Sequence, residues 1–273
     1  MSERLTTVER RRMSGVEWEF PSNDQLVSEE PLEMRLNGEA LAVTMRTPGD
    51  DFELVRGFLY TEQIVNRPEE ILGLERPGNG AKESHTNVVS ATVPPKILEG
   101  KCWLRNFYAS SSCGVCGKAS IEQLRLTRPI IESSFRVGVE RLYQVVGRMR
   151  KLQALFNQTG GLHAAALFNE RGEVVVVRED VGRHNAVDKV VGWAMESYQV
   201  PVRDLGLFVS GRSSFEIVQK AIAAGIPFVG AISAPSSLAV SLAKEYRVTL
   251  AGFVRGETCS VYSEPDRIQS NET

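Results

Sequence analysis

Apolar and polar residues alternate with a two-residue period in the first third of the chain, which is typical of half-buried strands. Residues 31–36 and 39–46 carry this alternation, and Asn37-Gly38 between them is a strong signal for a hairpin turn. Pro48-Gly49-Asp50-Asp51 then indicates the start of a helix, and residues 87–93 indicate a further strand. The buried face of that helix is expected to consist of Phe52, Val55, Phe58 and Leu59. This part of the chain is therefore predicted to be rich in β-structure.

From His163 onward, apolar strand-like runs alternate with amphipathic helical segments. Such an alternation predicts a mostly parallel sheet that is covered by helices. The predicted strands are 173–178, 205–210, 226–233, 248–254 and 260–263, and the predicted helices are 181–196, 213–224 and 236–246. Another helix, over residues 139–158, precedes them and ends at Gly160-Gly161. Its apolar stripe is expected to face the core or a second copy of the chain, and consists of Leu142, Val145, Met149, Leu152 and Phe156.

These patterns divide the chain into three regions. Residues 1–20 are dense in Arg and Glu, lack an apolar segment and are expected to form a flexible tail. Residues 21–135 form the β-rich N-terminal part, and residues 136–273 form an α/β domain that packs against it. The predicted fold class is therefore α/β, with a β-rich N-terminal part and a C-terminal α/β layer.

Composition excludes two classes of partner. With 273 residues, 42% hydrophobic and 24% charged, the chain is typical of a globular protein that needs no disulfide or metal to fold. Its formal net charge of -2 argues against a general nucleic-acid binder. Gly225 and Pro227 interrupt the longest apolar run, 221–232, which is too short to cross a bilayer. A cytoplasmic protein is expected, and there the four cysteines are better suited to chemistry or metal binding than to structural disulfides.

The segment Ser110–Lys118 places two thiols, Cys113 and Cys116, at a C-x-x-C spacing in a loop of small residues. Such a pair can share a metal, form a small disulfide ring, or act as a sulfur-bearing nucleophile with an assisting neighbour. The nearby Lys118 and the expected helix start after it both favour the thiolate. Since a free thiol has a pKa of about 8.5, a lowered pKa makes the reactive form abundant near neutral pH.

A zinc site is the less favoured interpretation of this loop. Structural zinc sites use four ligands, whereas Cys102, Cys259, His85 and His184 stand alone and no second C-x-x-C exists in the sequence. The segment around His163 is similar to the histidine element of zinc deaminases but lacks its glutamate. A thioredoxin-like reductase is disfavoured as well, because the pair does not follow the first strand of a βαβ unit. An inert loop is the remaining alternative, and no metal is expected.

Polar residues follow the predicted C-terminal strands at the points where these strands end. Arg183, Arg212 and Arg255 each lie at such a junction, and Ser-Ser pairs start two of the helices. Arginine forks and helix N-termini bind phosphate oxygens, so a phosphate-bearing ligand is one interpretation and ordinary helix caps are the other. His184 and Asp188 are one helical turn apart, which would let them face one another in either a structural or a proton-transferring role.

Together these residues resemble the formate dehydrogenase accessory sulfurtransferases (FdhD). The resemblance covers most of residues 31–262. Its motifs are Ser111–Gly117, Gly160–Ala166, Arg178–Lys189, Val209–Glu216, Ala231–Val240, Leu250–Gly256 and Val261-Tyr262. The run Glu179-Asp180-Val181-Gly182-Arg183-His184 is far more specific than the cysteine spacing alone.

The resemblance implies a sulfur carrier that takes sulfur from a cysteine desulfurase and passes it to the molybdenum of a bis(molybdopterin guanine dinucleotide) cofactor, for formate dehydrogenase. It implies a persulfide on Cys113 with Cys116 assisting, a homodimer, and a cytidine-deaminase-like fold in the C-terminal layer. The cofactor contacts that it implies, together with the edge arginines, are Phe253, Val254, Arg255, Gly256, Glu257, Thr258, Arg212 and Arg183. Glu257-Thr258-Cys259 departs from the more basic or glycine-rich turn expected there, and Cys259 is expected to be a small buried apolar residue.

Two other functions are compatible with the same residues. A cofactor chaperone would bind and deliver the pterin dinucleotide while its thiols transfer no sulfur. A redox-sensing thiol switch would use the cysteine pair alone. Mutation of Cys113 separates the carrier from the chaperone, because the carrier alone needs that thiol for chemistry.

Overall fold

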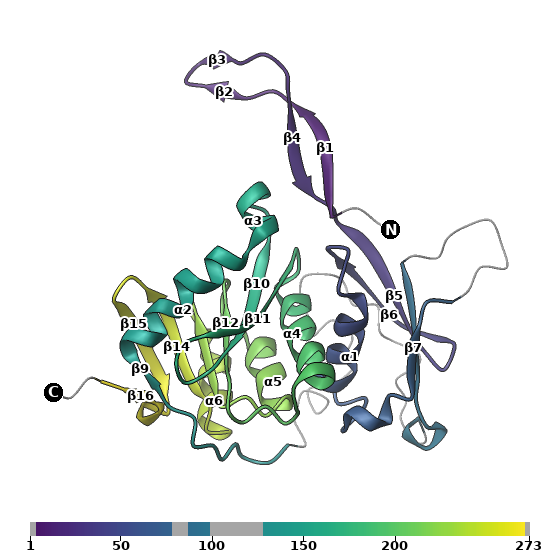
Figure 1. Ribbon diagram of the computed structural model, residues 1–273, viewed down its shortest axis with the longest axis vertical. Coiled ribbons are helices and arrows are strands. Elements are labelled where there is room, and N and C mark those ends of the chain that lie inside the picture. Colours follow the sequence, from purple (N-terminus) through teal and green to yellow (C-terminus); the bar gives the residue numbers. More distant parts are fainter. Residues whose placement is uncertain (1–3, 78–86, 99–127, 271–273) are drawn as a thin grey trace.

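The N-terminal region forms a narrow ribbon that projects from the body of the molecule (Figure 1). The computed structural model describes residues 4–77, 87–98 and 128–270. β1 (Leu5–Arg10) pairs antiparallel with β4 (Ser22–Val27), and β2 (Met13–Ser14) pairs with β3 (Glu17–Trp18). Where the sequence analysis expected a flexible tail over residues 1–20, the structure therefore has paired strands. These strands were missed because their side chains are largely exposed on both faces, which removes the apolar alternation of a half-buried strand.

The next unit is a four-stranded sheet with the order β6-β5-β8-β7. The predicted hairpin is confirmed: β5 (Glu30–Leu36) and β6 (Glu39–Arg46) are joined by Asn37 and Gly38, which both have positive φ. β8 (Val88–Thr92) confirms the third predicted strand and runs parallel to β5, while β7 (Gly73–Glu75) forms the other edge. The predicted helix is α1 (Asp51–Thr61). Two short 3-10 helices, Pro68–Glu70 and Pro95–Ile97, lie in the connections.

The C-terminal region contains a six-stranded sheet with the order β11-β10-β12-β13-β14-β15. Its strands are β10 (His163–Phe168), β11 (Val174–Asp180), β12 (Gly206–Val209), β13 (Phe228–Ala231), β14 (Thr249–Arg255) and β15 (Thr258–Ser263). The expectation of a mostly parallel sheet is wrong, because β12–β13 and β13–β14 are parallel while the other neighbouring pairs are antiparallel. Short hairpin connections after β10 and β14 force two of these antiparallel pairings. β11, β12, β13 and β14 nevertheless run in one direction, so their carboxyl ends lie along one edge.

Helices cover both faces of this sheet (Figure 1). On one face, α2 (Val139–Leu152) buries Leu142, Val145 and Met149 against aromatic side chains of the sheet. On the other face lie α4 (Arg183–Ser197), α5 (Phe215–Ala223) and α6 (Ser237–Glu245). The helix expected over 139–158 is divided at Gln153, after which α3 (Ala154–Thr159) begins. Leu152, a predicted core residue, is 55% exposed because α2 ends there. The chain closes with the 3-10 helix Pro265–Arg267 and β16 (Ile268–Gln269), which pairs with β9 (Val137–Gly138).

α1 joins the N-terminal sheet to the C-terminal layer by packing directly on α4 (Figure 1). The contact is made by glycines, because a Cβ on Gly57 would overlap the carbonyl oxygen of Asp188 and a Cβ on Gly192 would overlap that of Glu53. One continuous hydrophobic cluster consequently contains residues from both parts, including Leu54 and Leu59 of α1 and Val190 of α4. The α1–α4 contact therefore fixes the N-terminal part against the helices that carry the polar edge of the sheet.

Candidate functional site

The shared edge at the carboxyl ends of β11, β12, β13 and β14 forms a continuous surface of loops. His163 lies at this edge because it starts β10 and pairs with Asp180, the last residue of β11. The loops after β12 and β13 are tied together where the Ser213 amide donates to the Ala234 carbonyl at 3.3 Å. The loop after β13 is tied to β14 in turn, because the Phe253 amide donates to the Ser233 carbonyl at 3.2 Å. Ligands of open α/β sheets collect at such an edge.

A cavity of about 530 Å³ opens at this edge, between the sheet and the α2–α3 corner. From the sheet side it is lined by His163, Ser210 and Ile232, and from the helix side by Arg150 and Phe156, among others. The guanidinium of Arg150 lies 3.8 Å from the centroid of the Phe156 ring, so a flat cationic surface borders the cavity. The hydroxyl of Ser210 accepts a hydrogen bond from the Ala164 amide at 2.8 Å and is thereby fixed in the wall. This volume lies within the range of small-molecule sites.

His163 and Arg183 meet against Gly211, a position without a side chain. A Cβ there would lie 3.3 Å from Nδ1 of His163 and 3.8 Å from Cδ of Arg183, so glycine leaves room for both groups. Burial lowers the pKa of His163, and the neighbouring Arg183 and His184 side chains lower it further. Nε of Arg183 is buried and has no hydrogen-bond partner in the described part of the chain. At this edge the neutral imidazole of His163 therefore lies beside the guanidinium of Arg183, whose Nε–H has no acceptor among the described residues.

The lowered pKa of His163 predicts a pH effect on stability. Below the usual histidine pKa of about 6.5 the unfolded chain binds a proton that the folded chain resists, so stability falls as the pH falls through this range. The variant His163→Gln removes this linkage. Denaturant titrations at pH 7.5 and pH 5.5 should therefore show a smaller loss of unfolding free energy for the variant than for the parent chain. An equal loss in both proteins would contradict the prediction.

His184 does not face Asp188, contrary to the expectation from their spacing. Its Nε2 lies 3.4 Å from the hydroxyl of Ser214 and 3.7 Å from Oε2 of Glu216, both next to the start of α5. The neighbouring imidazole of His184 lowers the pKa of Glu216. Because α4 packs against α1 as well as α5, residues one turn apart on it reach different partners. Contacts with residues at the start of α5 therefore hold His184 at the edge formed by the carboxyl ends of the strands.

Asp188 belongs instead to a buried ion network between α1, α4 and α5. Its Oδ1 accepts the Thr61 hydroxyl at 2.7 Å, and its Oδ2 lies 2.9 Å from Nζ of Lys220. Lys220 also lies 2.9 Å from Oε1 of Glu62. Burial lowers the pKa of Lys220, but the carboxylates of Asp188 and Glu62 outweigh this effect and raise it. The lysine is therefore charged, and it joins the three helices. The sequence analysis did not identify this role, and the signal that could have shown it is a single lysine among the largely apolar residues of α5.

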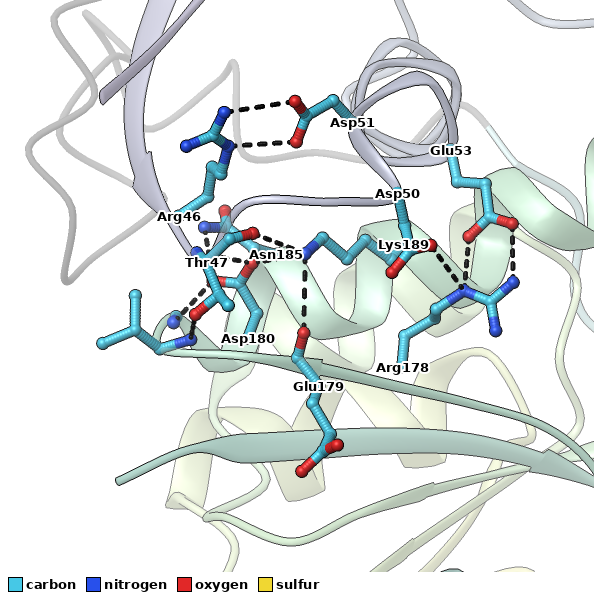
Figure 2. A network of polar contacts seen from close by, with 12 residues as sticks. Arg46, Thr47, Asp50, Asp51, Glu53, Arg178, Glu179, Asp180, Asn185 and Lys189 are labelled. Atoms are coloured by element: carbon cyan, nitrogen blue, oxygen red, sulfur yellow. Dashed lines mark hydrogen bonds and ion pairs between the residues drawn. The ribbon is translucent and has the colours of Figure 1, made fainter. Parts of the chain in front are cut away.

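The motif Arg178–Lys189 spans the end of β11 and the start of α4, and it forms a second buried network, which Figure 2 shows from close by. Nζ of Lys189 lies 2.7 Å from Oδ2 of Asp180 and donates to the Thr47 carbonyl at 3.1 Å. Asp180 also accepts hydrogen bonds from the Thr47 amide at 3.2 Å, the Gly182 amide at 2.8 Å and the Asn185 side chain at 3.0 Å. Asn185 in turn donates to the Met45 carbonyl at 2.7 Å. Much of this motif therefore anchors the N-terminal sheet to the start of α4.

Ion pairs around α1 extend the same junction (Figure 2). The buried guanidinium of Arg46 donates to both oxygens of Asp51, at 3.0 and 3.1 Å. Arg178 donates to both oxygens of Glu53, at 2.5 and 2.6 Å. These bidentate pairs hold the first turn of α1 against β6 and β11. Arg178 belongs to the motif Arg178–Lys189, yet its guanidinium stabilises the fold through its pair with Glu53.

The predicted cofactor contacts lie at the far end of the edge from Arg183. Arg255 is exposed and lies 5.8 Å above the ring of Phe253, whose positive φ marks a bulge in β14. Gly256 and Glu257 form the exposed turn into β15, where Thr258 pairs with Arg255. Val254 is fully buried in the cluster under α2, so its side chain is directed into the core.

The three edge arginines are not gathered at one point. The Arg183 side chain reaches the loop after β12, where its Cδ would lie 3.8 Å from a Cβ on Gly211, the neighbour of the exposed Arg212. Arg255, at the end of β14, is two strand spacings from β12, or about 10 Å at about 4.8 Å per strand. A ligand that contacts all three would therefore extend across the ends of β12, β13 and β14.

The cysteine pair Cys113 and Cys116 lies outside the described residues, as do Lys118, Cys102 and His85. Cys259 is described: it is partly buried and packs against the cluster under α2, beside Tyr143. Across residues 4–77, 87–98 and 128–270, no group of His, Cys, Asp and Glu has the arrangement of a metal site. Within those same residues, no helix combines the length and apolar character needed to cross a membrane.

Comparison with known proteins identifies a matching family, similar sequences and a similar solved structure. The sequence model of the FdhD/NarQ family matches residues 27–269. The sulfur carrier protein FdhD of Streptomyces avermitilis is 51% identical over 251 residues, which cover 90% of this chain and 89% of that protein. The protein of the same name from Sulfolobus acidocaldarius is 41% identical over 247 residues, covering 90% and 92%. A crystal structure of a formate dehydrogenase accessory protein from Desulfotalea psychrophila superposes with a TM-score of 0.77 at 23% identity, covering 98% of this chain and 100% of that one.

Proposed function

Because the chain belongs to the FdhD/NarQ family, we propose that it is a cytoplasmic sulfur carrier that supplies the molybdenum cofactor of a formate dehydrogenase. The observation that carries the proposal is the match over nine-tenths of the chain to relatives named sulfur carrier protein FdhD. The donor in this proposal is a cysteine desulfurase, and the acceptor is the molybdenum bis(molybdopterin guanine dinucleotide) cofactor, which is a substrate here. A homodimer and a cytidine-deaminase-like C-terminal layer, both implied by the family resemblance, remain parts of the same proposal.

In the first step, the Cys113 thiolate attacks the terminal sulfur of the donor's persulfide. A new S–S bond forms on Cys113, the donor's S–S bond breaks, and the donor cysteine leaves as a thiolate. In the second step, the Cys116 thiolate attacks the inner sulfur and releases the terminal sulfur at the level of hydrosulfide. The two electrons of that reduction come from the thiol pair, which ends as a Cys113–Cys116 disulfide that a thiol reductant must open. In this mechanism Cys116 is therefore the thiol that releases the sulfur from Cys113.

The edge of the six-stranded sheet is the proposed acceptor site. Arg212 and Arg255 are exposed there and form no ion pair with any described residue, and Nε of Arg183 has an unused donor. Cations without carboxylate partners are suited to the phosphates of a dinucleotide. In this proposal Arg183, Arg212 and Arg255 neutralise the phosphates, while the turn Phe253–Thr258 contacts the cofactor through side chains and backbone.

Intact-mass measurement after incubation with a desulfurase and cysteine tests the proposal. The parent chain should gain about 32 Da, the mass of one sulfur atom, and Cys113→Ala should gain nothing and fail to support formate dehydrogenase activity. Cys116→Ala should load sulfur but release it poorly. Arg255→Ala should load sulfur normally and bind guanine nucleotides roughly tenfold more weakly.

Each alternative makes a different prediction for the Cys113→Ala variant. If the variant fully supports dehydrogenase activity, the chain acts as a cofactor chaperone and the carrier proposal fails. A chain that neither loads sulfur nor binds guanine nucleotides, and whose thiols respond to oxidants alone, would be a thiol switch. The matched control is Cys259→Ala, since Cys259 packs against the core under α2 and should not affect loading.

A further inference from the structure

A second cavity, of about 420 Å³, lies at the edge of the six-stranded sheet that is opposite the proposed acceptor site. Its lining comes from the end of α1, the segment before β12, the end of α5 and residues 128–131. Arg203 precedes β12 and Gly225 precedes β13, so this cavity lies at the amino ends of both strands. The proposed acceptor site lies at their carboxyl ends. The cavity is therefore separate from the residues assigned to the cofactor, and its volume is within the range of small-molecule sites.

Backbone hydrogen bonds hold the walls of this cavity in place. The Val202 amide donates to the Ala224 carbonyl at 2.8 Å, which joins the segment before β12 to the end of α5. On another side, the Ile131 amide donates to the Tyr246 carbonyl at 3.0 Å, just after α6. Small-molecule sites are usually formed before the ligand arrives. These walls meet that condition, because the backbone holds them without the help of a ligand.

Arg128 lines this cavity, and the side of its guanidinium that binds carboxylates is unused. Its Nε and Nη2 form that side, and both are buried without a hydrogen-bond partner in the described part of the chain. The same two nitrogens of Arg46 donate to both oxygens of Asp51, and Arg178 uses them in the same way. The guanidinium of Arg128 lies 4.9 Å from the centroid of the Tyr60 ring, which holds it in position. Since buried polar groups nearly always have a partner, Arg128 indicates an acceptor that the described residues do not supply.

The charges around the cavity leave an excess of one cation. Arg203 lines it as well, and its exposed side chain forms no ion pair with a described residue. Arg67 is a third lining arginine, but its Nε lies 3.5 Å from Oε1 of Glu70 and is thereby neutralised. Among the lining residues that the structure describes, Glu69 alone carries a carboxylate. The two remaining arginines, opposed by Glu69, leave one positive charge, which is suited to a ligand with one negative charge.

Most of the remaining wall is apolar. It includes Ile130, which is 50% exposed, together with Pro129, Pro201 and Ile222. A wall of this kind with a few polar groups is typical of sites for small organic molecules. An inorganic anion would engage the guanidinium groups but would leave Ile130 exposed to water. The ligand is therefore expected to have an apolar body as well as an anionic group.

We propose that this cavity binds a small organic carboxylate with an apolar body, such as an aromatic or a branched aliphatic acid. The two carboxylate oxygens accept hydrogen bonds from Nε and Nη2 of Arg128, Arg203 supplies the second cation, and the apolar body covers Ile130. A phosphate ester has similar oxygens, but it carries a charge of about -1.5 to -2, which Glu69 would oppose. This site goes beyond the proposed sulfur transfer and does not depend on it.

Isothermal titration calorimetry of the full chain with phenylacetate tests the proposal. The parent chain should bind one equivalent, and Arg128→Gln should weaken binding at least roughly tenfold, because it removes the bidentate donor. Since Arg128 also stacks on Tyr60, the exposed Arg203→Gln provides a second variant that disturbs no packed ring, and it should weaken binding as well. The control Arg10→Gln removes an equal charge from the projecting ribbon and should bind like the parent chain. A parent chain that does not bind, or equal binding by both cavity variants and the parent chain, would overturn the proposal.

Related compounds separate the features of the ligand. Phenylacetamide has the apolar body without the charge, and acetate has the charge without the body, so each should bind at least roughly tenfold more weakly than phenylacetate. Tighter binding of phenyl phosphate than of phenylacetate would assign the site to a phosphate ester and reject the carboxylate.

Competition locates the site. A guanine nucleotide should not displace phenylacetate, because the proposed acceptor site lies at the opposite edge of the sheet. Displacement would place both ligands in one site and would overturn the proposal of a separate cavity. These titrations contain no cysteine desulfurase, so a failure of the sulfur-carrier proposal would leave their result unchanged.

Discussion

Replacing Asp180 with alanine is expected to destabilise the chain by about 3–5 kcal/mol, because it leaves the ammonium of Lys189 buried without its carboxylate. The two side chains are 0% and 1% exposed and lie 2.7 Å apart. Asp180 also accepts backbone hydrogen bonds from Thr47 and Gly182, whose amides would lose their partner. Equilibrium denaturation monitored by circular dichroism measures the change.

The exposed ion pair of Arg10 and Asp24 provides the matched control. Its atoms are 2.8 Å apart, but its side chains are 46% and 33% exposed, so Asp24→Ala should cost less than about 1 kcal/mol. The double variant Asp180→Ala/Lys189→Met should recover part of the lost stability, because it removes the stranded charge. If it recovers none, the loss comes from the backbone hydrogen bonds. Equal costs for Asp180→Ala and Asp24→Ala would refute the role given to the buried pair.

Alanine at Gly57 is expected to destabilise the chain by about 3 kcal/mol or more, although alanine is the better helix former by about 1 kcal/mol. The added methyl group would overlap the backbone carbonyl of Asp188, so α1 and α4 must move apart and loosen the core between them. Gly192→Ala should have a similar effect through the carbonyl of Glu53. Thermal and denaturant unfolding of the single variants measures both effects.

Gly147 in α2 is a suitable control because a Cβ there meets nothing within 4 Å. Gly147→Ala should stabilise the chain by about 0.5–1 kcal/mol through helix propensity alone. The double variant Gly57→Ala/Gly192→Ala should cost less than the sum of its parts, since one separation of the helices accommodates both methyl groups. Full additivity would indicate two independent clashes and would contradict the shared helix contact.

Local sequence patterns predicted the elements well where one face of an element is buried. The hairpin around Asn37-Gly38, α1 and the helices of the C-terminal layer follow from the two-residue and helical periods. The strands of the N-terminal ribbon were missed because their side chains are largely exposed, so their sequence lacks the alternation of apolar and polar residues. The helix over 139–158 was predicted as one piece, since its apolar stripe continues across the break at Gln153.

The candidate site was predictable in part for the same reason. Strand ends can be found in the sequence, so Arg183, Arg212 and Arg255 were assigned to junctions that the structure places along one edge. The cavity at the α2–α3 corner was missed, because its wall combines Arg150 and Phe156 with His163 and Ser210 from separate elements. The partner of His184 was also missed, since a helix packed on two sides directs neighbouring turns to different helices.

The sequence by itself determined most of the residues that face inward and where turns and strand ends fall, and it places two cysteines at a C-x-x-C spacing in the same chain as the arginines of the sheet edge. Tertiary structure alone decided the strand directions and the partners of the buried charges. Thr47 meets Asp180 across 133 residues, and Thr61 meets Asp188 across 127. Periodicity records whether a side chain is buried, but the group that neutralises a buried charge comes from another element, and that choice is made when the elements pack.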